Sequence, residues 1–552
     1  MAGLLDQLLR WLTNPRYLVV EELLLCCLLV LAWFAPRVLL FPRIERAFAL
    51  LARRPIASMA GLALGLIAVR LALLPLFPVP TPDFHDEFSY LLGADTFAHF
   101  RLTNPPHPLW PSFETIHVLS QPAYMSVYQP AQALVLAAGQ WLGHPWIGAL
   151  GAGAGMCAAF VWMLRGWMPP GWALLGGVLA ATRLCLFNYW MNSYWGGALA
   201  ALCGALVIGA SGRLIHWRSG ATRNAALWAL GAVILANRRP YEGLVLCASV
   251  GVLLLVRAPV RKLIAPMLAV MIPVAAWMGY YNWRGTGDVL LMPYQHAIDT
   301  YKVAGFFVWQ PIRQPPKYGN EQMRQYFVEW EIPIAKARRE RFVYTNVANF
   351  ASLWRFLLGP ALSLPLLAAP WLWRDRRMRP LIWIGVAGAA AMAVEVWLLP
   401  HYASPHTPLL WVLLLQMLRH LWQWGPRGRA AVGAVIVTTL LMTAVPIAAT
   451  ALKIEQAPSL SGWWSIKLRW ERDAFVRRLE TIPGRHLVLV RYGGGHDVHR
   501  EWVYNGADID RQRIVWAREL DVESNRRLRE YYRDRQAWLL VDDGTARLAP
   551  YP

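Results

Sequence analysis

Three carboxylates and one histidine lie within five consecutive positions, directly after a long apolar run. They are Asp83, His85, Asp86 and Glu87. Acidic side chains beside hydrocarbon are costly unless they face a cavity or a partner. A carboxylate held at a membrane surface can accept a proton from an attacking hydroxyl or amine. The spacing of the residues that follow predicts an amphipathic helix along the interface. Asp86 and Glu87 would lie at its N-terminal end, where backbone N–H groups favour negative charge. Helix capping alone is the simpler explanation of these acids.

Two adjacent arginines interrupt an apolar region further along the chain. Arg238 and Arg239 stand in the stretch Asn-Arg-Arg-Pro-Tyr-Glu-Gly. Because a guanidinium can donate two hydrogen bonds to one phosphate, the pair is a candidate phosphate site. The sequence does not choose between the two arginines. A pair that snorkels to the interface or sets the topology explains the pattern equally well.

Two short motifs place aromatic side chains at the predicted starts of helices. Tyr128 opens one apolar run in Tyr-Gln-Pro, and His401 and Tyr402 precede another in Pro-His-Tyr-Ala-Ser-Pro. Tyr402 is a candidate contact for a phosphate or a sugar. An interfacial aromatic belt explains these residues almost as well.

The composition places all of these residues in a membrane protein. Of the 552 residues 57% are apolar and 16% are charged, against about 45–50% and about 25% in average soluble domains. A disordered chain is therefore excluded and an ordinary soluble globule is disfavoured. The net charge of +21 is typical of nucleic-acid binding, but basic residues that hold loops in the cytoplasm explain it better, so no nucleic-acid partner is expected.

The apolar segments predict an all-α polytopic membrane protein with about 11–13 transmembrane helices. The segments are 17–41, 56–77, 130–143, 146–164, 171–187, 194–212, 224–236, 240–256, 263–283, 353–373, 380–399, 403–422 and 430–452. The charge pattern allows a single net crossing within 130–164, so one of the two pieces there is expected to be re-entrant or interfacial.

Five basic clusters predict which loops face the cytoplasm. They are Arg43, Arg46, Arg53 and Arg54; Arg213, Arg218 and Arg223; Arg257, Arg261 and Lys262; Arg374, Arg376, Arg377 and Arg379; and Arg419, Arg427 and Arg429. This orientation leaves the loops 78–129 and 284–352 and the tail from 453 on the outer face.

Three parts of the chain follow from this layout. Residues 1–55 form an additional N-terminal helix and a basic cytoplasmic loop, and 56–452 form the transmembrane catalytic part with its two outer loops. Residues 453–552 form a small extracytoplasmic α/β domain, because 487–490 and 538–541 read as strands and 521–534 between them has helical spacing.

The acidic pair, the outer loop and the Tyr-Gln-Pro motif together resemble the GT-C glycosyltransferases, which include protein O-mannosyltransferases and the aminoarabinose transferases of lipid A. The family's loop often ends in Tyr-Pro-Pro, whose first Pro is Gln129 here, and His401 stands where the family's late motif has Arg. The resemblance covers most of 56–452 in layout and implies a GT-C-like fold. The segment 17–41 is an addition before the family's usual first helix.

The resemblance implies a role for each candidate residue. Asp86 is the expected base, Glu87 orients the acceptor or supports Asp86, and Asp83 and His85 are second choices. Arg238 or Arg239 contacts the lipid phosphate of the donor. The remaining substrate-binding candidates are Tyr128, His401 and Tyr402. Some relatives use a divalent cation near these carboxylates, which the spacing here does not demand, so the metal and cofactor requirement stays open.

The resulting hypothesis is an integral glycosyltransferase of the cytoplasmic (inner) membrane. It would move a sugar from a polyprenyl-phosphate donor, with inversion, to an unknown glycan, lipid or protein acceptor on the periplasmic or exterior face. The alternative is a multi-span transporter or lipid flippase without covalent chemistry, for which a broken helix is a typical device. A non-enzymatic scaffold for envelope assembly is a third reading.

Overall fold

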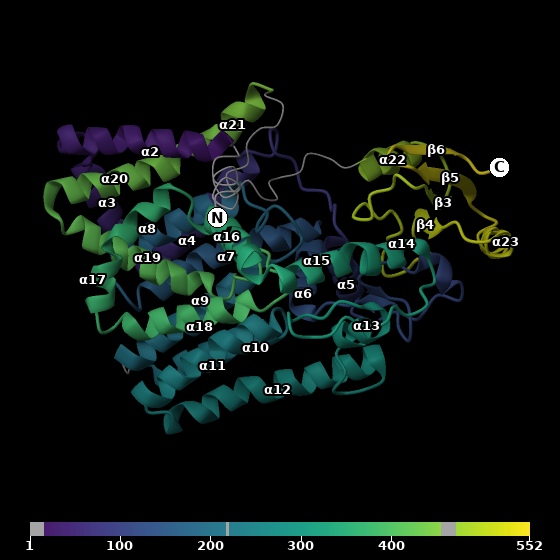
Figure 1. The fold of residues 1–552 in the computed structure, drawn as a ribbon, viewed down its shortest axis with the longest axis horizontal. Helices are drawn as coiled ribbons and strands as arrows, with labels where there is room; N and C mark the ends of the chain where they lie inside the picture. The colour runs from purple at the N-terminus through teal and green to yellow at the C-terminus, as the bar shows by residue number, and fades with distance from the viewer. Residues whose placement is uncertain (1–15, 217–219, 454–470) are drawn as a thin grey trace.

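The protein is a helical bundle with a small mixed β-sheet at one end (Figure 1). The computed structural model describes residues 16–216, 220–453 and 471–552; Arg218 of the predicted basic clusters and the first part of the predicted tail lie outside these ranges. The helices are α2 (Arg16–Phe34), α3 (Pro42–Arg53), α4 (Pro55–Ala72), α5 (His85–Ala98), α6 (Pro130–Trp141), α7 (Pro145–Leu164), α8 (Pro170–Ala180), α9 (Gly197–His216), α10 (Ala221–Ala236), α11 (Pro240–Arg257), α12 (Arg261–Thr286), α13 (Pro293–Tyr301), α14 (Glu321–Arg324), α15 (Glu331–Glu340), α16 (Phe342–Leu357), α17 (Ala369–Arg374), α18 (Arg379–Ala393), α19 (Thr407–Trp422), α20 (Gly425–Leu441), α21 (Ala444–Ala451), α22 (Glu471–Glu480) and α23 (Val522–Tyr531).

Six of the described helical segments are long and apolar enough to cross a membrane, or seven if one bent pair counts as a single span. They are α4, α7, α9, α11, α12 and the continuous stretch of α20 and α21. The predicted class, an all-α polytopic membrane protein, is confirmed. The predicted total of about 11–13 spans exceeds this count because several predicted spans form helices shorter than the roughly 20 residues that a crossing needs. Three of these, around α8, α10 and α18, are apolar.

One predicted span, 353–373, is wrong as a continuous helix. The helices Phe342–Leu357 and Ala361–Arg374 meet at an angle of 105°. Gly359 lies between them with φ of +63°, a left-handed conformation that favours glycine. Pro360 follows it and cannot donate a helical hydrogen bond. A broken span results at the position where the apolar pattern alone runs on without interruption.

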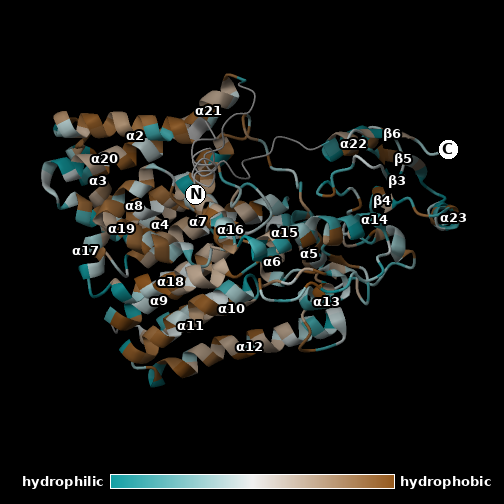
Figure 2. Cartoon of the chain, viewed as in Figure 1, coloured by the Kyte–Doolittle hydropathy of each residue, from teal (hydrophilic) through white to brown (hydrophobic). Residues whose placement is uncertain are grey.

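The two outer loops and the C-terminal strands gather at the same end of the bundle. Figure 1 shows α5, α6, α13, α14 and α15 on the side of the C-terminal sheet, and α3 and α17 at the opposite end. Apolar residues dominate the bundle helices and polar residues dominate α22 and α23 (Figure 2). This arrangement agrees with the predicted division between the basic loops and the outer segments.

Helix α5 carries the acidic pair and is more buried than predicted. Ten of its 14 residues are buried, so the prediction of an amphipathic helix along the interface is wrong. Tyr90 and Phe97 pack into the core of the bundle, while Phe88 and Leu92 pack into the core of the C-terminal sheet. The helix therefore lies between two hydrophobic cores.

The C-terminal sheet has four strands in the order β4-β3-β5-β6. Strands β3 (His486–Tyr492), β4 (Ile514–Arg518) and β5 (Gln536–Asp542) are parallel, and β6 (Ala546–Pro550) is antiparallel to β5. The predicted strands 487–490 and 538–541 lie in β3 and β5, and the predicted helix 521–534 contains α23. Asp521 caps α23 by accepting the N–H of Ser524.

Candidate active site

Asp86 lies in the first turn of α5 and is partly exposed. The hydroxyl of Tyr128 donates a hydrogen bond to its Oδ1. Tyr128 stands just before α6, whose first residue is Pro130. The tyrosine of the Tyr-Gln-Pro motif therefore contacts the acidic motif, so two of the predicted site residues lie together.

Glu87 is only 4% exposed and is engaged by the backbone. Its Oε2 accepts the N–H groups of Asp83 at 2.9 Å and Phe84 at 3.3 Å, and its Oε1 accepts the N–H of Tyr194 at 3.1 Å. Burial raises the pKa of Glu87 to about 7, although these backbone donors act in the opposite direction. Glu87 therefore joins the turn before α5 to the segment before α9.

His85 turns away from Asp86 and toward the C-terminal region. Its Nδ1 lies 2.7 Å from the hydroxyl of Tyr504 and its Nε2 lies 2.9 Å from the carbonyl oxygen of Val498. Burial, with the neighbouring His117 and His499, keeps the pKa of His85 well below its ordinary value. The side chain of Asp86, by contrast, is bonded to Tyr128, a predicted site residue from outside the acidic motif.

Arg238 reaches the same group of tyrosines from the break between α10 and α11. It is 3% exposed, and its Nη1 donates to the hydroxyl of Tyr90 at 2.7 Å. Its Nη2 donates to the carbonyl oxygen of Trp195. The ring of Tyr90 stacks on that of Tyr128 with centroids 4.7 Å apart, so two stacked tyrosines connect Arg238 to Asp86.

Arg239 differs from Arg238 in its partners. Its Nη1 lies 3.7 Å from Oε1 of Glu242, which is buried in the first turn of α11. Its guanidinium carbon lies 3.9 Å from the centroid of the Tyr402 ring. Arg238 has no ion-pair partner among the residues that the structure describes. Glu242 therefore pairs with Arg239, whereas its charge reaches Arg238 from beyond ion-pair distance.

His401 and Tyr402 lie beside this basic pair. The Nδ1 of His401 is 3.0 Å from the hydroxyl of Tyr189, and its ring contacts that of Trp195 edge-on at 4.8 Å. Burial lowers the pKa of His401 well below its ordinary value, and the two arginines act in the same direction. A neutral imidazole in this position adds no positive charge next to Arg238.

The structure brings in residues that the sequence motifs missed. Tyr90 and Tyr294 line the site on either side of Tyr128, because Tyr294 also stacks on that ring at 5.9 Å. After burial, the charge of Asp86 contributes to raising the pKa values of Tyr90, Tyr294 and Tyr402. The helical spacing after Glu87 includes Tyr90, and this spacing could have identified Tyr90 as a site residue. Tyr294 lies in an outer loop whose aromatic residues have no specific spacing, so no sequence pattern identifies it.

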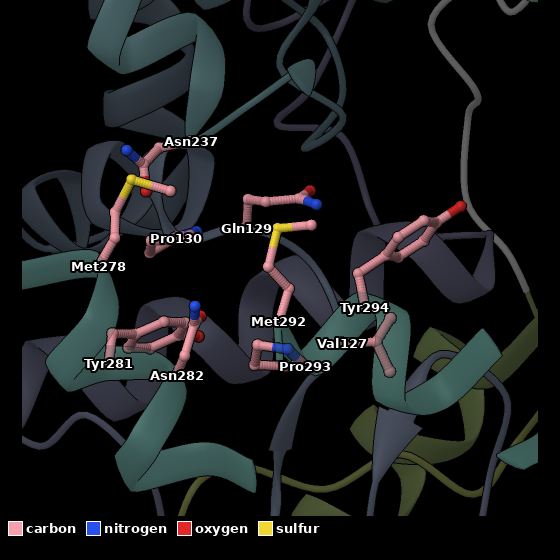
Figure 3. A pocket seen from close by; sticks show the side chains of 10 residues that line it. All are labelled: Val127, Gln129, Pro130, Asn237, Met278, Tyr281, Asn282, Met292, Pro293 and Tyr294. Carbon is pink, nitrogen blue, oxygen red and sulfur yellow. The ribbon is translucent and has the colours of Figure 1, made fainter. Parts of the chain in front are cut away.

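A small recess with a mostly apolar lining adjoins the tyrosines (Figure 3). It lies between the C-terminal end of α12 and the starts of α6 and α13. Its lining residues are Val127, Gln129, Pro130, Asn237, Met278, Tyr281, Asn282, Met292, Pro293 and Tyr294. The most apolar 18-residue stretch of α12 is 6% buried within the protein, whereas Tyr281 and Asn282 of the same helix are buried at the recess. Tyr294 belongs to both the recess and the tyrosine group.

The predicted metal ligands are not arranged as a metal site. Within residues 16–216, 220–453 and 471–552 no group of three or more His, Cys, Asp and Glu side chains is placed to hold a metal ion. Both ring nitrogens of His85 and both oxygens of Glu87 have protein partners. A requirement for a divalent cation stays an untested prediction.

Comparison with known proteins finds likeness in structure and none in sequence families. No family model and no curated protein sequence matches the chain. ArnT from Cupriavidus metallidurans in the apo state has a TM-score of 0.49 and 13% identity, over 87% of this chain and 93% of that one. The same protein bound to undecaprenyl phosphate has a TM-score of 0.45 and 13% identity, over 88% and 92%.

The archaeal oligosaccharyltransferase AglB from Archaeoglobus fulgidus, in complex with an inhibitory peptide and a dolichol-phosphate, has a TM-score of 0.38 and 11% identity, over 87% of this chain and 69% of that one.

Proposed function

We propose that this protein is an integral membrane glycosyltransferase of the GT-C type. It transfers a sugar from a polyprenyl-phosphate donor to an envelope acceptor on the outer, periplasmic face of the cytoplasmic membrane. The acceptor is a glycan, a lipid or a protein. The observation that carries the proposal is the meeting of the carboxylate of Asp86 and the buried guanidinium of Arg238 at a single group of tyrosines, beside an apolar recess.

Asp86 has the surroundings that a general base needs. Its Oδ1 accepts the hydroxyl of Tyr128, and the side chain is partly exposed. The second carboxylate oxygen is then available to accept the proton of an acceptor hydroxyl or amine. Glu87 supports this arrangement by fixing the turn that precedes α5.

Arg238 is suited to the leaving phosphate. As the acceptor oxygen or nitrogen attacks the anomeric carbon, the bond from that carbon to the phosphate oxygen breaks and its electron pair stays on the phosphate. Asp86 takes the acceptor proton. An arginine that lies beyond ion-pair distance of every described carboxylate stabilises the charge that develops on the leaving group, and direct displacement inverts the anomeric centre.

The recess is suited to the lipid end of the donor. It is lined by Met278, Met292 and Tyr281 among other residues, and flexible thioether side chains adapt to irregular apolar ligands. Because Tyr294 lines the recess and also stacks on Tyr128, a prenyl chain lying there brings its phosphate toward the Asp86 side.

The test is turnover by the purified protein in nanodiscs supplied with a polyprenyl-phosphate sugar and candidate acceptors from the envelope. Release of free polyprenyl phosphate coupled to a glycosylated acceptor supports the proposal. Movement of the intact donor across the bilayer without cleavage supports the transporter instead. Wild-type turnover by Asp86→Asn removes Asp86 from the role of base.

A further inference from the structure

We propose that residues 498–507 of the C-terminal region are a positioning element for α5, with Tyr504 as its central residue. The inference rests on the proposed function, since it concerns how Asp86 is held for catalysis. Tyr504 and His85 are 419 positions apart in the chain, so no sequence motif links them.

The first contact is at the start of α5. The Tyr504 hydroxyl lies 2.7 Å from Nδ1 of His85 and 3.0 Å from the carbonyl oxygen of Ile116. The carbonyl oxygen of Val498 lies 2.9 Å from Nε2 of His85. His85 is 2% exposed. Both of its ring nitrogens are thus bound by one segment, and the same hydroxyl reaches the outer loop before β1 (Val118–Leu119).

Further contacts follow α5 toward its other end. The ring of Tyr504 stacks on that of Phe88 with centroids 4.3 Å apart and an interplanar angle of 3°. At the next turns, the N–H of Ala507 donates to Oδ2 of Asp95 at 2.7 Å. Residues 498–507 therefore contact α5 at three levels, on the side opposite to the bundle core.

The segment is itself fixed to the sheet. Asn505 exchanges two hydrogen bonds with the backbone of Trp516 in β4, at 2.9 and 3.0 Å. The guanidinium of Arg472 donates to the carbonyl oxygen of Tyr504 at 2.9 Å. Because the segment is hydrogen-bonded to a packed sheet, its contacts can restrict the position of α5.

The consequence for the reaction concerns Asp86, which directly follows His85. A displacement of about 1 Å at a reacting group can lower a rate by about 100-fold. Tyr128 holds Asp86 from the bundle side, and the 498–507 segment holds the residue before it from the other side. We infer that the C-terminal region contributes to turnover by fixing the first turn of α5.

The test compares Tyr504→Phe with Tyr532→Phe in the full-length protein. Tyr504→Phe removes the hydroxyl and keeps the ring on Phe88. Tyr532 is a matched control, because it is buried in the same region and its hydroxyl binds Asp510 at 2.6 Å and His107 at 3.1 Å, away from α5. We expect kcat to fall about 10-fold in Tyr504→Phe, with the donor KM within about 2-fold, and both constants to stay within about 2-fold in Tyr532→Phe.

Hydrogen–deuterium exchange of the peptides covering 84–92 gives a readout that does not depend on activity. Faster exchange in Tyr504→Phe than in Tyr532→Phe supports the inference. Equal exchange and equal kcat in the two variants overturn it, as does an equal loss of activity in both, which would reflect docking of the whole region. If the wild type transfers no sugar, the proposed function fails, and the exchange experiment alone still decides whether Tyr504 fixes α5.

Discussion

The acidic start of α5 and the basic break between α10 and α11 are built in the same way. Each presents two residues of like charge in succession, Asp86–Glu87 and Arg238–Arg239. In each pair one member has its charge bound within the protein: Glu87 by backbone N–H groups and Arg239 by Glu242. The other member contacts only neutral tyrosine or carbonyl groups in its hydrogen bonds.

The comparison indicates a common arrangement, in which we expect one member of each pair to hold the backbone and the other to act in the proposed reaction. A buried charge without a partner is costly, so a site can hold few of them. Pairing one member locally fixes the backbone at that point. The remaining member then faces the site from a rigid support. The pairs are thus expected to respond differently when either member is changed.

The largest expected effect is on turnover at Asp86. Asp86→Asn removes the proton acceptor and keeps the size of the side chain, so kcat should fall by about 10²–10⁴-fold, the usual contribution of a general base. Measured donor binding should change little. Glu87→Gln with the larger loss of kcat would reverse the assignment within the acidic pair.

The arginine pair should separate binding from stability. Arg238→Gln should remove the proposed charge-assisted hydrogen bonds to the donor phosphate, each worth about 1.5–3 kcal/mol. The donor KM should rise by about 10–100-fold, and kcat should also fall because the charge on the leaving group grows in the transition state. Arg239→Gln leaves Glu242 buried without its partner, and such a loss typically costs about 3–5 kcal/mol of stability. Donor titrations and thermal unfolding of both variants measure the donor KM and the stability. A larger rise of the donor KM in Arg239→Gln and a larger loss of stability in Arg238→Gln would contradict the prediction.

Glu87→Gln should act mainly on stability. An amide offers one acceptor oxygen where the carboxylate serves three backbone N–H groups, so at least one donor stays buried without an acceptor. The expected loss is about 1–3 kcal/mol in the free energy of unfolding. Unfolding of purified Glu87→Gln and Asp86→Asn in detergent measures the difference in stability. Equal stability of the two variants would argue against a stabilising role for the hydrogen bonds from the backbone to Glu87.

The same carboxyl predicts a pH dependence. Its pKa is raised to about 7 in the folded protein from an ordinary value near 4.5, so the folded state retains a proton that the unfolded state releases. The free energy of unfolding should therefore fall as the pH rises from about 5 to about 7. Glu87→Gln should lose this part of the pH dependence, which unfolding curves at several pH values measure.

The smallest effect is expected at Tyr128. Tyr128→Phe removes the hydroxyl that donates to Asp86 and keeps the ring between Tyr90 and Tyr294. Turnover should fall about 3- to 10-fold, comparable to the loss of one hydrogen bond of about 1 kcal/mol, with the donor KM unchanged. A loss as large as that in Asp86→Asn would mean that Tyr128 itself acts in the reaction.

The sequence predicted the membrane class and the parts that depend on local pattern. Strands at 487–490 and 538–541 are marked by β-branched and aromatic runs, and the acidic pair is marked by its place after an apolar helix. The broken span at Gly359 was missed because the apolar run continues through the break. Burial of α5 on both sides was missed because it needs Tyr504, which lies far away in the chain.

The roles within each charged pair also lie beyond sequence pattern. The family resemblance favours Asp86 over Glu87 as the base, but the physical difference between the two acids, the N–H groups of Asp83 and Tyr194 at Glu87, needs the structure. Arg238 and Arg239 are likewise distinguished only by the position of Glu242. Spacing identifies which residue types reach a site, whereas tertiary contacts decide which of them keeps its charge available.

The burial of α5 between two cores bears on how the protein is made. During synthesis α5 emerges long before Tyr504, which the ribosome adds about 400 residues later. Until then Phe88 and His85 have no cover on one side, so a partly made chain carries an unfinished first turn next to Asp86. Completion of the first turn of α5 therefore waits until residues 498–507 have been made and have packed against it.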